Sequence, residues 1–182
     1  MTEGRAALIK LVNRYLGGFM DTEITLLEIH KLMYFMQEAG QPLRLTCSKG
    51  NFGPYAENLR FVLTKIDGYY TSGYGDGTDR PDKRIDLVPG ADKEAEEFLA
   101  GNDDALRRFE KVANLVDGFE SPFGMELLAT VHWVLTREGA GSLDSVVNKT
   151  WAWNARKSKF SREDISLAYK VLIERGWLEA RV

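Results

Sequence analysis

The chain has 182 residues, about the length of one domain. Hydrophobic residues make up 44% and charged residues 28%, the proportions of an ordinary globular protein, which excludes collagen-like, disordered and coiled-coil chains. A single cysteine, Cys47, excludes an internal disulfide and indicates a reducing compartment. Neither a secretion signal nor an apolar run of about 18 residues is recognisable, so we expect a cytoplasmic protein with no membrane contact.

The formal net charge of −3 is unevenly distributed. Residues 67–104 contain 4 basic and 11 acidic side chains, whereas residues 1–66 contain 8 and 6, and residues 105–182 contain 12 and 10. The middle segment therefore carries the whole negative excess. Because phosphates attract cations, this charge argues against direct binding of nucleic acid by that segment and favours a basic partner.

Two helices are predicted near the N-terminus. Apolar residues recur at a spacing of three to four over residues 2–16, and again over residues 25–40. Thr25 and Glu28 have the spacing of a capping box, in which each side chain bonds the backbone amide of the other. This box predicts where the second helix begins.

The next segments mix strand and helix patterns. Residues 43–50 resemble a short strand, and Pro54 stands where a third helix can begin without losing a hydrogen bond and then run to Gly68. Residues 69–89 alternate in polarity around a glycine and aspartate turn, which predicts a hairpin with an acidic tip.

The second half of the chain is predicted to be helical. Helical periodicity covers residues 92–99, 103–116 and 122–136. Ser161 and Asp164 then form a cap for a helix that ends at Gly176, and the strand-like residues 177–182 make this end winged-helix-like. The expected fold class is α+β, mostly α-helical, with a small hairpin or sheet.

We expect one domain over residues 1–182, with a possible division into residues 1–118 and 119–182. The apolar stripes of the predicted helices supply the core. Its expected members are Leu32, Met36, Leu59, Val62, Leu128, Trp133 and Leu172.

Candidate catalytic and metal-binding residues are few. His30 and His132 lie inside predicted helices and belong to no recognised catalytic motif, so both are interpreted as structural. A metal set of Glu28, His30 and Cys47 is improbable because the i, i+2 spacing of the first two directs them apart on a helix. The sequence therefore predicts no catalytic residue, metal or cofactor.

Two interpretations remain open for the acidic hairpin, and two for a basic segment near the C-terminus. Asp76, Asp79, Asp82 and Asp86 make the hairpin either a solvated tip or an acidic docking surface. Residues 149–162, called the basic strip here, interleave Trp151, Trp153 and Phe160 with five cations, the composition of a nucleic-acid-binding surface. The alternative is that its tryptophans belong to the core and its cations are solvated.

The run KGNFGPYAENLR, residues 49–60, is the most distinctive in the chain. Glycines flank Phe52, Pro54 stiffens the backbone, and Tyr55 and Asn58 are placed on one side of the first turn of the expected helix. Propensity alone does not assign a function to this shaped turn.

Several motifs in chain order, EIHKLMYFMQEAG, KGNFGPYAENLRFVL, SGYGDG, WNARK and a terminal RGWL, resemble the C-terminal domain of DarG antitoxins. KLMYF followed by GPY is more distantly similar to Panacea (SocA-like) antitoxin domains. DarG antitoxins pair a macro domain, which removes ADP-ribose from DNA, with a second domain that blocks the DarT toxin, a DNA ADP-ribosyltransferase. The resemblance implies a non-enzymatic toxin-binding part without the macro domain, either isolated or cut from a longer antitoxin.

On this reading the chain occupies the toxin's DNA groove with an acidic surface that mimics DNA. We expect the partner surface on the shaped turn and the acidic hairpin, where we also expect the tyrosines to be exposed. Its residues are Lys49, Asn51, Phe52, Tyr55, Asn58, Tyr74, Asp76, Asp79, Asp82 and Asp86. A nucleic-acid-binding winged-helix-like module and an enzyme remain as alternatives.

Overall fold

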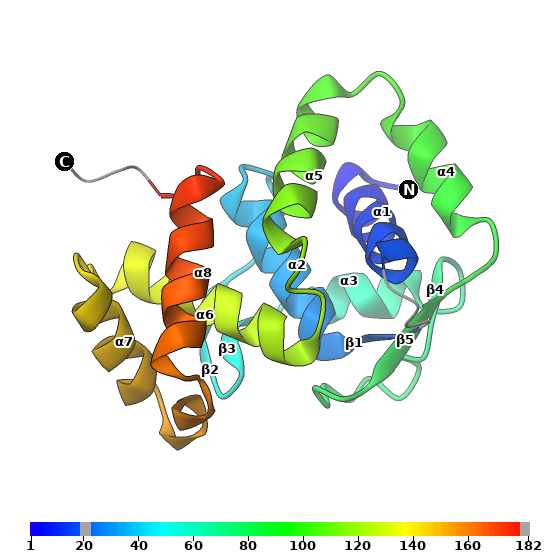
Figure 1. Cartoon of the computed structure of the whole chain (residues 1–182). Helices are drawn as coiled ribbons and strands as arrows, with labels where there is room; N and C mark the ends of the chain where they lie inside the picture. Colours follow the sequence, from blue (N-terminus) through cyan, green and yellow to red (C-terminus); the bar gives the residue numbers. More distant parts are fainter. Residues whose placement is uncertain (19–22, 179–182) are drawn as a thin grey trace.

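A computed structural model describes residues 1–18 and 23–178 of the chain (Figure 1). The helices in these ranges are α1 (Glu3–Gly18), α2 (Leu26–Glu38), α3 (Leu59–Ile66), α4 (Ala91–Leu99), α5 (Asp103–Val116), α6 (Pro122–Arg137), α7 (Leu143–Ala152) and α8 (Arg162–Glu174), with a short 3-10 helix, η1 (Ala155–Lys159). The strands are β1 (Ile24–Thr25), β2 (Cys47–Gly50), β3 (Gly53–Ala56), β4 (Thr71–Ser72) and β5 (Arg84–Leu87). The mostly α-helical α+β fold predicted from the sequence is confirmed.

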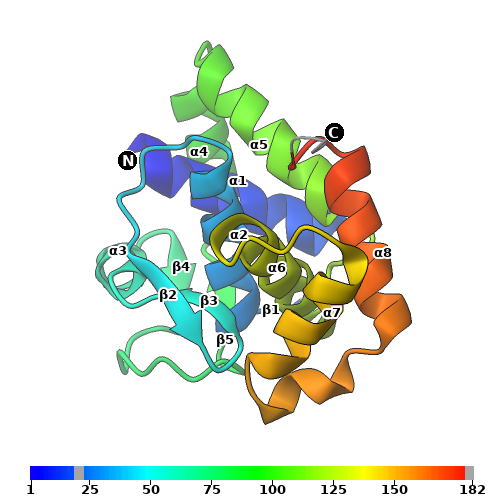
Figure 2. The ribbon, with the colours of Figure 1, turned by 90° about the vertical axis from the view of Figure 1, so that its left-hand side faces the viewer.

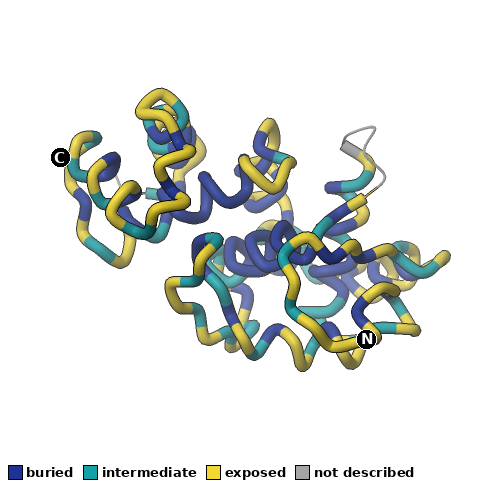
Figure 3. Tube along the Cα trace, turned by 90° about the horizontal axis from the view of Figure 1, so that it is seen from below, coloured by how far each residue is buried: buried dark blue, intermediate teal, exposed yellow. Residues whose placement is uncertain are grey.

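Helix α2 lies at the centre of the molecule. The predicted capping box is present, because Thr25 and Glu28 bond each other's backbone amides at its start. Every residue from Leu26 to Met36 is buried, and the helix packs against α1, α5, α6 and β3 (Figures 1 and 3). A helix that is apolar around nearly its whole circumference is stable only when enclosed in this way.

Two small antiparallel sheets flank α2. In the first, β5 lies between β1 and β4, with Ile24 opposite Ile85 and Thr71 opposite Leu87. In the second, β2 and β3 form a tight hairpin in which Gly50 pairs with Gly53 around the turn residues Asn51 and Phe52. Figure 2 shows this β2–β3 hairpin beside the segment that joins α7 to α8.

Helices α6, α7 and α8 pack on one another at the opposite end of the molecule from α1 and α4 (Figure 1). Ser121 and Ser142 cap α6 and α7 through their side-chain oxygens. Ser161 and Asp164 form the predicted capping box of α8. Because α6 also packs on α2 and β3, this end of the molecule reaches the β2–β3 hairpin directly.

Three elements differ from the sequence predictions. Pro54 does not begin a helix but lies in β3, because residues 53–56 pair with residues 47–50, and α3 begins only at Leu59. Helix α7 was not predicted; its last four residues, 149–152, were assigned only to the basic strip. Trp177 and Leu178 form a bend rather than a strand, and the rest of the expected terminal strand, residues 179–182, lies outside the described residues.

The predicted core is largely confirmed. Five of its seven members are fully buried: Leu32, Met36, Leu59, Leu128 and Leu172. Val62 and Trp133 are half-buried and pack against the same cluster. Among residues 1–18 and 23–178, none of the helices is long and apolar enough to cross a membrane.

Candidate functional site

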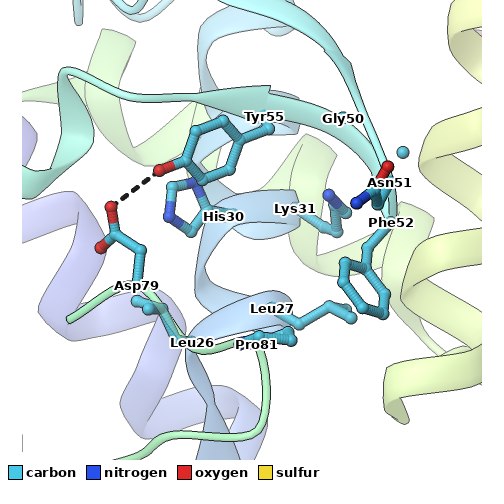
Figure 4. A pocket seen from close by; sticks show the side chains of 11 residues that line it. Leu26, Leu27, His30, Lys31, Gly50, Asn51, Phe52, Tyr55, Asp79 and Pro81 are labelled. Atoms are coloured by element: carbon cyan, nitrogen blue, oxygen red, sulfur yellow. Dashed lines mark hydrogen bonds between the residues drawn. The ribbon is translucent and has the colours of Figure 1, made fainter.

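A pocket of about 190 Å³ lies between the first half of α2, the β2–β3 hairpin, and residues Asp79 and Pro81 of the acidic hairpin (Figure 4). Its walls are mainly apolar and aromatic. The lining residues are Leu26, Leu27, His30, Lys31, Gly50, Asn51, Phe52, Gly53, Tyr55, Asp79 and Pro81. A concave, mostly apolar site with a few polar groups is the usual form of a ligand-binding pocket.

His30 supplies one wall of the pocket. Its imidazole is 6% exposed and stacks on the ring of Tyr55, with 4.6 Å between centroids and 25° between planes. Neither ring nitrogen has a hydrogen-bond partner within the described part of the chain. Burial lowers the pKa of His30 to about 3. The charge of the neighbouring Lys31 lowers this pKa further, and Asp79 has a smaller, opposing effect. The ring is therefore neutral at pH 7 and offers one donor and one acceptor.

Asp79 connects the acidic hairpin to the pocket. Its two carboxylate oxygens accept hydrogen bonds from the hydroxyls of Tyr55, at 2.7 Å, and Tyr74, at 2.5 Å. Burial, followed by the hydrogen bond to Asp79, raises the pKa of Tyr55 to about 12. Tyr55 therefore donates at neutral pH and holds the tip of the acidic hairpin against β3, whereas Tyr74 bonds Asp79 within the hairpin itself.

Lys31 and Gly53 fix the base of the β2–β3 turn. The Lys31 side chain is buried, and its Nζ donates a hydrogen bond of 2.6 Å to the carbonyl oxygen of Pro54. Burial, followed by the charge of Lys157, lowers the pKa of Lys31 to about 7. Gly53 has a φ of 95°, and a Cβ at this position would lie 2.9 Å from Oγ1 of Thr130 in α6. Only glycine fits this combination of left-handed backbone and close packing.

The basic strip docks onto the same turn. The indole of Trp153 donates to the carbonyl oxygen of Gly50, and the amide of Asn154 donates to that of Asn51. The Arg156 guanidinium lies over the ring of Phe52, 4.2 Å from its centroid, and is about half exposed. An aromatic side chain and an accessible cation therefore meet at the edge of the pocket.

Glu126, in α6, binds two lysines of the basic strip. This buried carboxylate accepts hydrogen bonds from Lys157, at 2.6 Å, and Lys159, at 2.5 Å. Burial alone would raise its pKa, but the hydrogen bonds and charges of the two lysines hold the pKa of Glu126 below its usual value. Much of the strip's positive charge is therefore used inside the protein, whereas the second interpretation of this segment expected solvated cations.

The structure brings only some of the predicted partner residues together. Phe52, Asn51, Tyr55 and Asp79 line the pocket. Lys49 is nearby but forms an ion pair with Glu138, 2.6 Å away.

The other predicted partner residues have different surroundings. The side-chain amide of Asn58 bonds the backbone of Arg44 and Thr46, which gives it a structural role in the loop before β2. Tyr74 is 2% exposed, so the expectation that it is an exposed tyrosine is wrong; its ring is enclosed because its hydroxyl is bound to Asp79. Asp82 and Asp86 are exposed on the acidic hairpin.

Asp76 is engaged within the chain. It forms an ion pair with the buried ammonium of Lys83, and this hydrogen bond, with those from Thr78, lowers the pKa of Asp76. This pairing compensates one of the charges that a DNA-like surface would need to present, and the two tyrosine hydroxyls occupy the carboxylate oxygens of Asp79. The acidic tip is thus partly neutralised from within.

Seven lining residues are not among the predicted partner residues: Leu26, Leu27, His30, Lys31, Gly50, Gly53 and Pro81. The signal that was available is the pair of adjacent polar residues His30 and Lys31 in the middle of an otherwise apolar helix. In a helix that is enclosed on all sides, such residues lie either in a buried polar contact or at an internal pocket. Lys31 makes a buried polar contact with Pro54, and His30 lines the pocket.

Over nearly its whole length the chain is similar to bacterial proteins that are named as glycohydrolases. A DNA ADP-ribosyl glycohydrolase of Thermus aquaticus is 43% identical over 178 residues, which are 98% of this chain and 48% of the relative. Proteins of the same name from Mycobacterium bovis and Mycobacterium tuberculosis are 37% identical over 176 residues, 90% of this chain and 50% of theirs. The chain thus spans about half the length of these relatives. No protein-family model matches it.

These names correct the functional expectation from the sequence. The comparisons support the resemblance to DarG proteins only to the level of similarity to DNA ADP-ribosyl glycohydrolases. These relatives are named for an enzymatic activity, not for binding a toxin. The expectations of a toxin-blocking antitoxin domain and of a chain that is not an enzyme are therefore contradicted. The first expectation relied on the resemblance to DarG antitoxins and the second on the lack of a recognised catalytic motif in the sequence. The DNA-mimicry mechanism relied on the acidic hairpin, where Asp76 and Asp79 are engaged within the chain.

Proposed function

We propose that this chain is part of an enzyme that removes ADP-ribose from DNA, and that its own contribution is to bind the modified DNA at the pocket beside the basic strip. The observation that carries the proposal is the similarity of 98% of the chain to a relative named for this activity. Because the chain spans about half of that relative, cleavage is proposed for the whole protein and substrate binding for this part.

The surroundings of the pocket suit a nucleic acid. Proteins that bind single strands combine aromatic side chains, on which bases stack, with cations that follow the phosphates. Phe52 lines the pocket and lies under the half-exposed Arg156, which also pairs with Glu126 at 3.7 Å. Lys49, near the turn, is a second cation, paired with Glu138 and partly exposed. A base inside the pocket would leave its phosphate on the side of these cations. This proposal replaces the earlier expectation against direct contact with nucleic acid.

Binding suits the pocket better than bond cleavage. Hydrolysis of a glycosidic bond commonly uses two carboxyl groups on either side of the bond. The pocket is lined by one carboxylate, Asp79, and both of its oxygens accept hydrogen bonds from tyrosines. These bonds hold Asp79 in place as a hydrogen-bond acceptor. Binding of a toxin protein, which the resemblance implies, stays a prediction.

The proposal is tested with a single-stranded oligonucleotide that carries ADP-ribose. The protein is incubated with it, binding is followed by fluorescence anisotropy, and released ADP-ribose is measured by mass spectrometry. We expect binding that weakens with rising salt, because phosphate contacts release counterions. We also expect release by protein of the relatives' full length. Absence of release by that longer protein would overturn the proposed activity.

A matched pair of charge variants assigns the binding surface. Arg156→Gln removes the cation over Phe52, whereas Arg107→Gln removes an exposed arginine of α5 that pairs with Asp104. We expect the first variant to weaken binding of the oligonucleotide several-fold and the second to leave it unchanged. Equal effects of the two variants would mean that binding is not localised at the pocket.

A further inference from the structure

The two histidines of the chain differ in one respect that points to a ligand. His132 is 2% exposed, and its Nδ1 lies 2.7 Å from the hydroxyl of Tyr34, with which it shares a hydrogen bond. His30 is buried to a similar degree, yet neither of its nitrogens has a protein partner in the ranges that the structure describes. Nearly all buried polar groups in proteins are hydrogen-bonded, because an unsatisfied one is costly. Since His30 lines a pocket, a ligand in that pocket is the natural partner.

The size of the pocket limits the ligand. An apolar cavity of about 150 Å³ accepts a benzene ring, whereas pockets for drug-sized molecules measure about 300 to 1,000 Å³. At about 190 Å³ the pocket takes one ring system and not a whole nucleotide. Figure 4 shows the His30 and Tyr55 rings on one side and Phe52 on the other, with Leu27 and Pro81 between them. These walls favour a flat, unsaturated ligand.

The charged side chains of the pocket are engaged within the protein, Lys31 with Pro54 and Asp79 with two tyrosines, so the contact offered by His30 favours an uncharged ring. The His30 imidazole is neutral at pH 7 because burial lowers its pKa to about 3, so it presents one N–H donor and one acceptor rather than a charge. A neutral heterocycle with both donors and acceptors on its edge complements this ring. The Arg156 cation outside Phe52 then lies where an attached phosphate would be placed.

We propose that the pocket binds a nucleobase, with the imidazole of His30 hydrogen-bonded to the edge of the base and Phe52 against its face. This inference rests on the proposed function, which supplies modified DNA as the ligand class. It specifies the part of that ligand that enters the pocket. The modified DNA contains nucleobases in two places, in the DNA strand and in the adenine of the ADP-ribosyl group. Hydrogen bonds to the edge of a base and stacking on its face are the ways in which proteins hold an unstacked nucleotide.

The test observes the two histidines directly in one sample. Long-range ¹H–¹⁵N NMR spectra of the imidazoles are recorded during separate titrations with ADP-ribose, with an unmodified single-stranded oligonucleotide of mixed sequence, and with ribose 5-phosphate. We expect at least one of the two base-containing probes to shift the nitrogen signals of His30 in a saturable way. The signals of His132 and the titration with ribose 5-phosphate serve as internal controls and should show no change.

The probes also separate the two sources of the base. A response to ADP-ribose alone assigns the adenine of that group, a response to the oligonucleotide alone assigns the DNA strand, and a response to both shows that the pocket accepts either. If neither probe shifts the His30 signals at millimolar concentration, the nucleobase assignment is overturned.

His30→Phe provides the second arm, because it keeps a flat ring beside Tyr55 and removes both nitrogens. We expect the dissociation constant of the effective probe to rise at least tenfold in this variant, with Arg107→Gln unchanged. Unaltered affinity of a folded His30→Phe chain would contradict the role of the imidazole. Release of ADP-ribose by the longer protein without any response of His30 would overturn this inference alone. A His30 response without release would overturn the proposed activity alone.

Discussion

The indole Nε1 of Trp153 donates a hydrogen bond of 2.9 Å to the carbonyl oxygen of Gly50, 103 residues earlier in the chain. This bond joins the basic strip to the β2–β3 turn and so closes one side of the pocket. We expect Trp153→Phe to lower the free energy of unfolding by about 1 kcal/mol, the usual value of one hydrogen bond. Hydrogen exchange at the turn amides should become faster as well.

Trp151→Phe is the matched control for this change. The Trp151 indole donates a bond of 2.8 Å to the carbonyl oxygen of Phe160, which is not part of the turn. A similar loss of stability is expected, without faster exchange at residues 50–53. If both variants accelerate exchange there equally, the bond to Gly50 does not hold the turn.

Glu126 is expected to be among the most sensitive polar residues of the fold. Glu126→Gln leaves the Lys157 ammonium, which is fully buried, without its counter-charge. Removing one partner of a buried pair typically costs about 3 to 5 kcal/mol. Urea unfolding should therefore show a loss of this size. Replacing Lys157 by Met in the same chain should recover much of it, whereas a double variant no more stable than Glu126→Gln would contradict this account.

Asp79→Asn tests the link between the acidic hairpin and β3. The change removes the charge that accepts hydrogen bonds from Tyr55 and Tyr74, and bonds to charged groups contribute about 1.5 to 3 kcal/mol each. A loss in that range is expected in a thermal or urea unfolding experiment. Asp82→Asn, an exposed neighbour on the same tip, should stay within about 0.5 kcal/mol of the wild type. Equal losses in the two variants would show that charge alone, and not the tyrosine bonds, matters.

The buried histidines predict a dependence of stability on pH. Burial lowers the pKa of both histidines from 6.5 to about 3. The pKa of His30 is further lowered by Lys31 and raised by Asp79. The pKa of His132 is further lowered by Arg137 and Lys111. Between these pKa values the unfolded chain binds more protons than the folded chain. The stabilising effect of keeping these groups neutral is therefore complete above about pH 6.5 and is lost as the pH falls toward 3.

The slope of this dependence is measurable in urea unfolding at a series of pH values. Each histidine contributes up to about 1.4 kcal/mol per pH unit, and between about pH 5 and 6 most carboxylates are still ionised. His30→Phe should halve the slope in this interval. It should also be at least as stable as the wild type at pH 7, because it removes two buried nitrogens that have no partner among residues 1–18 and 23–178. A slope that His30→Phe leaves unchanged would mean that His30 does not titrate as described.

The sequence predicted those elements whose signals are local. Helix α5 begins and ends at the predicted residues, Asp103 and Val116, because its amphipathic spacing and flanking residues lie within a single segment. Pro54 was assigned to a helix because its fixed φ suits a first turn, but the same φ is accepted in β3 once residues 47–50 pair with it.

The pocket was only half predicted for a similar reason. Phe52, Tyr55 and Asp79 were selected because turns and charge patterns are visible in the sequence. His30 was interpreted as structural because its helix is apolar on both sides of it, and its missing partners are visible only when the β2–β3 hairpin and the Pro81 segment are folded against α2. The role of the basic strip could not be predicted, since Glu126, which binds its lysines, lies more than 30 residues earlier in the chain.

The complete enclosure of α2 determines which side of the pocket can adjust to a ligand. A helix in contact with neighbours around its whole circumference can neither turn nor slide without disrupting the core, so His30 is as immobile as the fold itself. The opposite wall consists of a two-residue turn and a loop that are open to solvent on one side. Entry and release of a ligand should therefore depend on opening of the hairpin and loop, and the rate of exchange should follow the strength of the bonds that close them.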